Sequence, residues 1–210
     1  MRQVTVVDYG SGNLLSVTRA LERVGASVSL ASDAASVLRA ERLLLPGVGA
    51  FEEGMKGLAQ RGLVDGLRAF ARSGRPLLGI CLGMQMLADV SEEFGEHAGL
   101  GLVGGRVQAI PGQDVRGHPL RVPFVNWAEL QPSRSWSGST LDGVPVASSF
   151  YFVHSFRLVV TDPAHEIAHY VYGGHRVAAV VQSGAVIGCQ FHPEKSGPAG
   201  LTLLSRFVGA

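Results

Sequence analysis

Short apolar runs alternate with amphipathic helical stretches over the first 90 or so residues, and this alternation limits the fold more than any other feature. Strand-like runs are expected at residues 3–7, 26–30, 42–45 and 76–80. Helical patterns are expected at residues 14–24, 51–60, 62–72 and directly after Cys81. Such an alternation predicts a parallel sheet with helices on both faces. The continuous apolar run PLLGI at 76–80 is typical of a strand buried on both faces.

The second half of the chain has a different pattern, with short β-rich runs separated by Gly or Pro. These runs are residues 102–109, 121–130, 150–160, 166–172, 176–182 and 185–190. YGGH at 172–175 and QSGA at 182–185 have the composition of hairpin turns. A last helix is expected over 198–208. We therefore predict one α/β domain over residues 1–210, with a mostly parallel sheet flanked by helices and antiparallel strands added in the second half.

The composition narrows the functional classes. Apolar residues make up 46% of the chain and charged residues 17%. These proportions exclude an intrinsically disordered chain and favour a large buried core. The formal charge of +1 gives no polybasic surface for nucleic acid and no acidic tail. No apolar stretch approaches the length of a membrane span, and the first residues do not resemble a signal peptide. With only two cysteines, we expect a reduced, cytoplasmic, soluble protein without a membrane partner.

Residues 79–83, GICLG, join the buried run at 76–80 to a helical pattern. This is the form of a nucleophile elbow, in which a residue on a sharp strand-to-helix turn is flanked by glycines. Unpaired N–H groups at the start of a helix favour a thiolate at Cys81, and the N–H of Leu82 is placed to donate to an oxyanion. The alternative is that Cys81 is simply a small buried side chain.

A cysteine nucleophile needs a base, and the segment GCQFHPEKS at 188–196 offers one. His192 follows a predicted strand, and Glu194 lies two residues further on. In extended chain, residues i and i+2 point to the same side, so the Glu194 carboxylate is placed to orient the His192 imidazole. Pro193 between them restricts the backbone. An exposed loop is the alternative for this segment, and for Cys189 a buried, inert thiol is expected.

Residues 165–175, HEIAHYVYGGH, match the H-E-x-x-H pattern of zinc hydrolases and offer a third histidine. That pattern needs a helix, whereas Ile167, Tyr170 and Val171 favour a strand. On a strand, His165 and His169 would lie ~13 Å apart, too far for one zinc ion. We therefore expect no metal site here. Gly10-Ser11-Gly12 starts a nucleotide-binding pattern, but Leu15 replaces its third glycine and the match is weak.

The motifs GICLGMQ and FHPEKS together resemble those of the class I, or triad, glutamine amidotransferases. Within that family, DYGSGN near the start, PGVGAF at 46–51 and YFVHSF at 151–156 are similar to the glutaminase subunits of imidazole glycerol phosphate synthase, an enzyme of histidine biosynthesis. The resemblance covers nearly the whole chain, with the motifs in the same order.

The resemblance implies that Cys81 attacks the side-chain amide of glutamine, that His192 transfers protons, and that Glu194 orients His192. It also implies a glutamyl thioester intermediate and no cofactor. The backbone N–H groups of Val48 and Leu82 would form the oxyanion hole. The residues implied to hold glutamine are Gly47, Gly49, Gln85 and the backbone of His154 and Ser155.

The resemblance further implies a heterodimer with a cyclase subunit, a (β/α)₈ barrel that uses the ammonia to make imidazole glycerol phosphate and aminoimidazole carboxamide ribotide. Asn13, Trp127 and Lys195 match family positions at that interface. The alternatives are a helix cap for Asn13, a core residue for Trp127 and a solvated surface residue for Lys195. A glutaminase for another synthase and a non-enzymatic relative are further alternatives.

The chain departs from the family at residues 123–128. The family's usual pattern is Pro-His-x-Gly-Trp-Asn, and this chain has Pro-Phe-Val-Asn-Trp-Ala. Phe124, Asn126 and Ala128 replace the His, Gly and Asn, while Trp127 is kept. Because this stretch faces the partner in the family, the departure concerns coupling between subunits more than glutamine hydrolysis.

Overall fold

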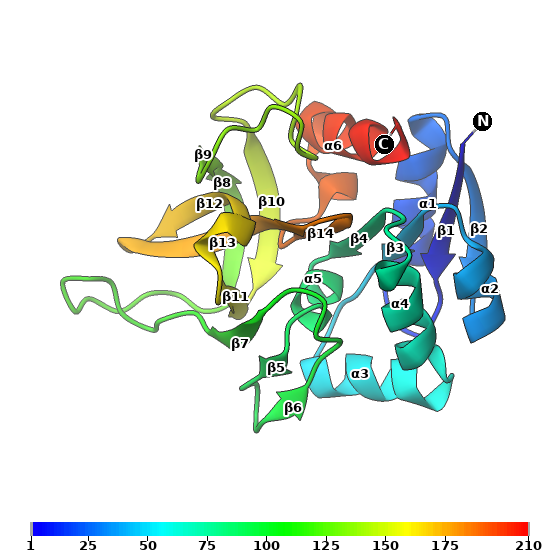
Figure 1. Ribbon diagram of the computed structural model, residues 1–210. Helices are drawn as coiled ribbons and strands as arrows, with labels where there is room; N and C mark the ends of the chain where they lie inside the picture. Colours follow the sequence, from blue (N-terminus) through cyan, green and yellow to red (C-terminus); the bar gives the residue numbers. More distant parts are fainter. Residues whose placement is uncertain (1, 210) are drawn as a thin grey trace.

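A computed structural model describes residues 2–209 and is built around an eight-stranded sheet (Figure 1). The strand order is β2-β1-β3-β4-β14-β13-β12-β9. The parallel strands are β1 (Gln3–Val7), β2 (Ser27–Ala31), β3 (Leu43–Leu45), β4 (Leu77–Ile80) and β14 (Val186–Cys189). The antiparallel strands are β13 (His175–Ser183), β12 (Glu166–Tyr172) and β9 (Gln131–Pro132). The α/β fold with a mostly parallel sheet and added antiparallel strands is thus confirmed.

Helices cover both faces of this sheet, and each face has its own apolar cluster. On one face pack α1 (Leu14–Arg23) and α6 (Gly197–Gly209), which bury Leu21 and Phe207. On the other face lie α2 (Ala34–Arg39), α3 (Phe51–Gln60), α4 (Leu63–Arg72) and α5 (Leu82–Met86). Leu77 contributes to one cluster and Leu78 to the other. This strand is buried on both sides because its residues alternate between the two faces.

Two smaller sheets complete the second half of the chain. One contains β11 (Phe156–Val160), β7 (Gly105–Ala109), β5 (Val90–Ser91) and β6 (His97–Ala98). The other pairs β10 (Ser149–His154) with β8 (Phe124–Glu129). Two single 3₁₀ turns, η1 (Pro163–His165) and η2 (Pro193–Lys195), follow β11 and β14. Residues 110–121 form a long connection that projects from the body of the molecule (Figure 1).

The structure corrects several details of the sequence analysis. No helix was expected over 34–39, where Asp33 caps α2 by accepting a hydrogen bond from the Ser36 N–H at 2.8 Å. The run at 150–160 is two strands of different sheets, because the chain turns at Ser155. The run at 185–190 contains β14, which is antiparallel to β13 on one side but parallel to β4 on the other, and so extends the parallel part of the sheet.

Within the HEIAHYVYGGH segment, residues 166–172 form a strand, as Ile167, Tyr170 and Val171 indicate. His165 ends η1 and His169 lies within β12, where its Nδ1 atom is 3.0 Å from Ser133 Oγ. Within residues 2–209, no group of three or more His, Cys, Asp or Glu side chains is arranged to hold a metal ion. Over the same residues, no helix combines the length and apolar character needed to cross a membrane.

Candidate active site

Cys81 lies at the turn between β4 and α5, in the position of an elbow. Its backbone has φ 55° and ψ −111°. Residues with side chains rarely adopt such a conformation, which costs of order 1–3 kcal/mol. Its N–H donates to the Cys189 carbonyl at 2.8 Å, and its own carbonyl accepts from Gln85 N–H at 3.2 Å, so the residue is fixed on both sides despite the strain. Its thiol is free and only 7% exposed.

Glycines allow the chain segments at this turn to approach closely. A Cβ atom added at Gly83 would lie 1.9 Å from the Leu45 carbonyl oxygen at the end of β3. At Gly47 an added Cβ would lie 2.8 Å from the Gly83 nitrogen and from the Tyr9 hydroxyl. The start of α5 thus packs directly against the PGVG segment, and no side chain separates them.

His192 and Glu194 form a buried pair on the turn that follows β14. His192 Nδ1 lies 2.8 Å from Glu194 Oε1, and their side chains are 4% and 1% exposed. The Nε2 atom of His192 and the Oε2 atom of Glu194 are buried without a hydrogen-bond partner among the described residues. With Nδ1 facing the carboxylate, Nε2 is the nitrogen left for chemistry.

The pairing of β14 with β4 brings Cys81 and His192 to the same end of the sheet. Ile80 lies opposite Cys189 in the parallel register, so Cys81 and the residues after Cys189 leave the sheet together. Burial opposes the imidazolium of His192, but the Cys81 sulfur and the Glu194 carboxylate outweigh burial and raise the pKa of His192 from 6.5 to about 9. The three predicted residues are therefore assembled in one electrostatically coupled group.

The PGVG segment passes beside this group. Gly49 has φ 93°, a left-handed conformation that suits glycine. The Val48 carbonyl oxygen accepts a hydrogen bond from Ser11 Oγ at 3.1 Å, which ties the segment to the loop after β1. Leu82, as the first residue of α5, has an N–H with no carbonyl of its own helix to bond. Leu82 follows Cys81 directly, and Gly47, next to Val48, packs against Leu82 and Gly83; the oxyanion-hole roles of Val48 and Leu82 stay a prediction.

Two glutamine side chains connect Cys81 to β11, and only one of them was predicted. Gln85 Nε2 donates to the Phe156 carbonyl at 2.9 Å and to Gln190 Oε1 at 3.1 Å. Gln190 Nε2 in turn lies 3.9 Å from Cys81 Sγ. Gln190 was missed, although it stands two residues before His192 in the same alternating pattern that pointed to Glu194.

The His154 side chain is not directed to the candidate site. Nδ1 donates to the Phe156 carbonyl at 2.8 Å, and Nε2 accepts from the Tyr170 hydroxyl at 2.9 Å. Both ring nitrogens are occupied, and burial lowers the pKa of His154 to about 4. Any contribution of His154 and Ser155 to glutamine binding therefore comes from the backbone, as predicted, and stays a prediction.

The three predicted interface residues have different surroundings. Asn13 caps α1, since its Oδ1 accepts from the Ser16 N–H at 3.3 Å. Trp127 is 51% exposed on β8, so the alternative of a core residue is wrong. Its ring packs beside Tyr151, and the Lys195 ammonium lies 5.9 Å from the centre of the same Tyr151 ring. Trp127 and Lys195 thus share one surface.

Residues 123–128, which depart from the family pattern, lie partly in the core and partly on the surface. Phe124 is 8% exposed and stacks on Tyr170, with ring centres 4.9 Å apart. Asn126 is exposed, and its Oδ1 accepts from the Trp127 N–H at 2.8 Å. Phe124 is buried while Asn126 and Trp127 are exposed, so the change at 124 affects the core and the change at 126 alters the surface beside Trp127.

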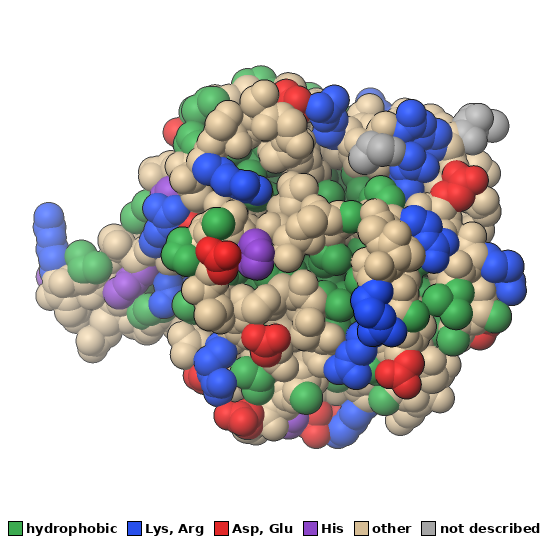
Figure 2. Space-filling view, in the orientation of Figure 1, with side chains coloured by type: hydrophobic (Ala, Val, Ile, Leu, Met, Phe, Trp, Pro, Cys, Tyr) green, Lys and Arg blue, Asp and Glu red, His purple; other side chains and the backbone are tan. Residues whose placement is uncertain are grey.

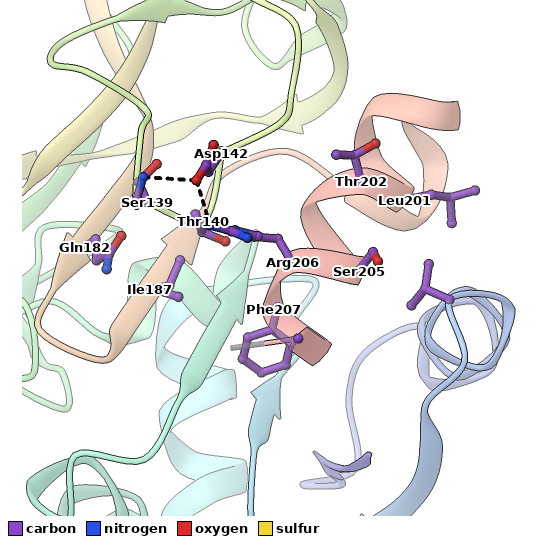
Figure 3. A pocket seen from close by; sticks show the side chains of 13 residues that line it. Ser139, Thr140, Asp142, Gln182, Ile187, Leu201, Thr202, Ser205, Arg206 and Phe207 are labelled. Carbon is purple, nitrogen blue, oxygen red and sulfur yellow. Dashed lines mark hydrogen bonds and ion pairs between the residues drawn. The ribbon is translucent and has the colours of Figure 1, made fainter. Parts of the chain in front are cut away.

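A cavity of about 750 Å³ lies elsewhere, between α6 and residues 138–142, and contains none of the predicted site residues (Figure 3). Its rim carries the ion pair of Arg206 and Asp142, with an N–O distance of 2.6 Å. We place the candidate site at Cys81 because the coupled side chains are there. On the face shown in Figure 2, cationic and anionic side chains are interspersed, in keeping with the near-neutral charge.

Comparisons with known proteins identify the family of the chain. The sequence model of the family "Glutamine amidotransferase class-I" matches residues 5–209. The chain is 46% identical over 211 residues to imidazole glycerol phosphate synthase subunit HisH 1 of Legionella pneumophila strain Lens, covering 99% of each. It is 46% identical over 209 residues to subunit HisH of Geobacillus thermodenitrificans, covering 100% of this chain and 96% of the relative.

Among solved structures, PurLQS from Thermotoga maritima superposes with a TM-score of 0.72 at 22% identity, covering 100% of this chain and 99% of that one. A likeness at this identity concerns the fold alone. The match to the family model and the full-length identity to the relatives decide the family. The chain belongs to the class I glutamine amidotransferases and, within them, to the family of HisH subunits of imidazole glycerol phosphate synthase.

Proposed function

We propose that this chain hydrolyses glutamine to glutamate and ammonia with Cys81 as nucleophile, His192 as general base and acid, and Glu194 as the group that orients His192. The observation that carries the proposal is the buried group in which Glu194 holds Nδ1 of His192 at 2.8 Å while Cys81 and Glu194 raise the pKa of His192 to about 9. An imidazolium beside a cysteine is the resting state that keeps the sulfur ready for attack.

In the first half of the proposed reaction, Cys81 Sγ forms a bond to the side-chain amide carbon of glutamine. The proton of the thiol resides on His192 Nε2, and the carbonyl oxygen becomes an oxyanion that accepts hydrogen bonds from the backbone N–H groups of Val48 and Leu82. The carbon–nitrogen bond then breaks, and His192 gives its proton to the departing ammonia. A glutamyl thioester on Cys81 remains.

In the second half, His192 Nε2 takes a proton from water, and the resulting hydroxide attacks the thioester carbon. The same oxyanion hole receives the negative charge, and collapse of the intermediate releases glutamate and regenerates the sulfur. Glu194 keeps Nδ1 of His192 protonated throughout, so that Nε2 exchanges the proton in both halves.

Substrate glutamine is proposed to bind between the PGVG segment and the start of β11. Gly47 and Gly49 leave the backbone open to close approach, and the backbone of His154 and Ser155 lines the other side. Both N–H groups of Gln85 are used by Phe156 and Gln190, which leaves its oxygen to accept from the substrate. We therefore assign Gln85 to the α-amino or amide N–H groups of glutamine.

The ammonia is proposed to pass to a cyclase subunit of (β/α)₈ fold, with histidine biosynthesis as the setting in the cytoplasm. The names of the relatives, subunits of imidazole glycerol phosphate synthase, support this partner. The exposed surface of Trp127 and Lys195, together with Asn13, is the proposed contact. The alternative is that the chain is the glutaminase subunit of a different synthase. It is favoured by the departure from the family pattern at Asn126, which lies beside Trp127.

The nucleophile is tested by treating the protein with a glutamine-analogue alkylator and mapping the modified residue by mass spectrometry. The expected result is a mass increase on Cys81 alone, prevented by excess glutamine. Cys189 serves as an internal control, because it is fully buried and burial raises its pKa. Modification at another residue, with Cys81 unlabelled, would contradict the proposed nucleophile.

The partner is tested by measuring ammonia release from glutamine with and without a substrate-loaded cyclase subunit of imidazole glycerol phosphate synthase. We expect slow hydrolysis by this chain alone and faster hydrolysis with the cyclase. Absence of stimulation, with Cys81 still reactive toward the alkylator, would leave the glutaminase chemistry standing and contradict the partner.

A further inference from the structure

Gln190 is a buried polar residue whose side chain reaches the reacting sulfur, and the proposed reaction above gives it no role. It follows β14 and is fully buried. Its backbone N–H donates to the Ala179 carbonyl at 2.9 Å, which anchors it to β13. Its side-chain nitrogen lies 3.9 Å from Cys81 Sγ, within the range of a hydrogen bond to sulfur. A buried amide needs hydrogen-bond partners for both its oxygen and its NH₂ group, so its orientation decides which of the two faces the sulfur.

The orientation of the Gln190 amide is fixed by a chain of hydrogen bonds that starts at a backbone carbonyl. The Phe156 carbonyl can only accept, so Gln85 must present its NH₂ group to it. The same NH₂ group reaches Gln190, which must therefore present its oxygen to Gln85. The NH₂ group of Gln190 is then the end that faces Cys81 Sγ.

The sulfur has two neighbours of opposite preference. The Val153 carbonyl oxygen lies 3.9 Å from Sγ and can only accept, so it favours the neutral S–H form. The Gln190 N–H groups can only donate to the sulfur, so they favour the thiolate. A donor next to a thiolate is more effective in a buried site than in water, because little solvent competes for the charge.

We propose that Gln190 is a catalytic residue that stabilises the Cys81 thiolate by donating a side-chain N–H to its sulfur, with the thiol proton held on His192 Nε2. The proposal deepens the glutaminase function above and rests on it. Gln190 offsets the Val153 carbonyl, whereas His192 supplies the countercharge. Gln85 acts through Gln190 here, as the positioning residue that keeps the amide from turning its oxygen to the sulfur.

Of the titratable groups around Cys81, only Cys81 and His192 are expected to change protonation between pH 5 and 9. Tyr9 interacts with Cys81, but burial raises its pKa to about 12. Cys189 also interacts with Cys81, and burial raises its pKa as well, so it stays neutral. Glu194 is bound to His192 on the far side of the ring. Between pH 5 and 9, a change of sulfur reactivity therefore reports on the pair of Cys81 and His192.

The test is the rate of Cys81 alkylation by iodoacetamide as a function of pH, located on Cys81 by mass spectrometry. Gln190→Glu keeps an acceptor for Gln85 but puts a carboxylate beside the sulfur. Gln190→Met keeps the length and removes the donor. We expect the midpoint of the profile to rise by about one pH unit or more in Gln190→Glu and by about half a unit in Gln190→Met. The turnover number for glutamine should fall about 10–100-fold, with KM within about threefold.

Gln182→Glu is the matched control, since it makes the same change of charge near the C-terminal end of β13, beside Ile187 and the cavity of Figure 3. Its midpoint should equal that of the unchanged protein. Either Gln190 variant decides the question alone if the other does not fold, as judged by circular dichroism. A midpoint unchanged in a folded Gln190 variant would overturn the proposal and leave the glutaminase function intact. An unchanged protein whose Cys81 is unreactive below pH 9 would overturn both.

Discussion

The Nδ1 atom of His192 lies 2.8 Å from Oε1 of Glu194, with both side chains almost fully buried. Burial alone would keep the histidine neutral, so the charged neighbours decide its protonation. The protonation of His192 therefore depends on Glu194 and on the pH of the solvent.

Replacing Glu194 by Gln should lower the pKa of His192 from about 9, because one of the two groups that offset burial is lost. Glutamine hydrolysis should fall by roughly 10²–10⁴ in turnover, the range for losing general acid–base assistance. Nuclear magnetic resonance titration of His192 and ammonia release measure the two effects. Glu22→Gln, on the exposed side of α1, is the control. An unshifted His192 titration in Glu194→Gln would contradict the role of the carboxylate.

Stability should respond to the same pair. Since the folded-state pKa of His192 lies above 6.5, its contribution to the free energy of unfolding is present below about pH 6.5 and lost as the pH rises through about 9. The melting temperature of the unchanged protein should therefore fall more steeply between pH 7 and 9.5 than that of Glu194→Gln.

His154 should have the opposite effect on stability. Burial lowers its pKa to about 4, so between pH 6.5 and 4 the unfolded chain binds a proton that the folded protein does not. Stability is present in full above about pH 6.5 and is lost as the pH falls toward 4. In urea unfolding measured from pH 4 to 8, His154→Gln should weaken this acid dependence and cost about 1–3 kcal/mol at pH 7, because the Tyr170 and Phe156 bonds are disturbed. If the free energy of unfolding of His154→Gln falls as steeply below pH 6.5 as that of the unchanged protein, groups other than His154 cause the loss of stability in acid.

Gly83→Ala should destabilise the protein by about 4 kcal/mol or more, the range of severe overlap in a core. The reason is that the added methyl would lie 1.9 Å from the Leu45 carbonyl oxygen. Gly112→Ala is the matched control, because a Cβ atom there meets nothing within 4 Å. Its stability should stay within about 0.5 kcal/mol of the unchanged protein. Urea unfolding compares the two, and equal stabilities would mean that β3 and α5 separate more easily than their packing indicates.

Trp127→Ala should leave folding nearly unchanged, within about 0.5 kcal/mol, because the ring is half exposed. If the surface of Trp127 and Lys195 binds the cyclase, the same change should weaken association by about 2 kcal/mol or more. Calorimetric titration with the cyclase subunit measures the affinity. Val171→Ala, at an exposed position on β12, is the control, and equal affinities of the two variants would remove Trp127 from the contact.

The strand-and-helix alternation of the first 90 residues predicted the parallel sheet, because each element has its own local period. Helix α2 was missed because six residues give too short a pattern, and its cap at Asp33 is a local contact. The direction of β14 was also missed. Its apolar sequence fits any buried strand, whereas its direction and its place beside β4 depend on the tertiary fold.

The site residues were found from their chemical type and local spacing, but their meeting depends on that parallel pairing. His192 and Glu194 are neighbours in sequence, so their contact was predictable from the alternation of an extended chain. Gln190 belongs to the same alternation and was overlooked because an amide carries no charge. Its orientation depends on Gln85 and Phe156, and no local pattern connects these three residues.

The backbone of Cys81 has φ 55° and ψ −111°. Only glycine enters this region without cost. Gly at this position would relax the turn, so Cys81→Gly should melt at a higher temperature than Cys81→Ala, which keeps the penalty and loses the sulfur as well. Differential scanning calorimetry of the two inert proteins compares them, and equal melting points would mean that the turn is not strained. The strained backbone at Cys81 thus lowers the stability of the protein and at the same time places the thiol at the end of a central strand.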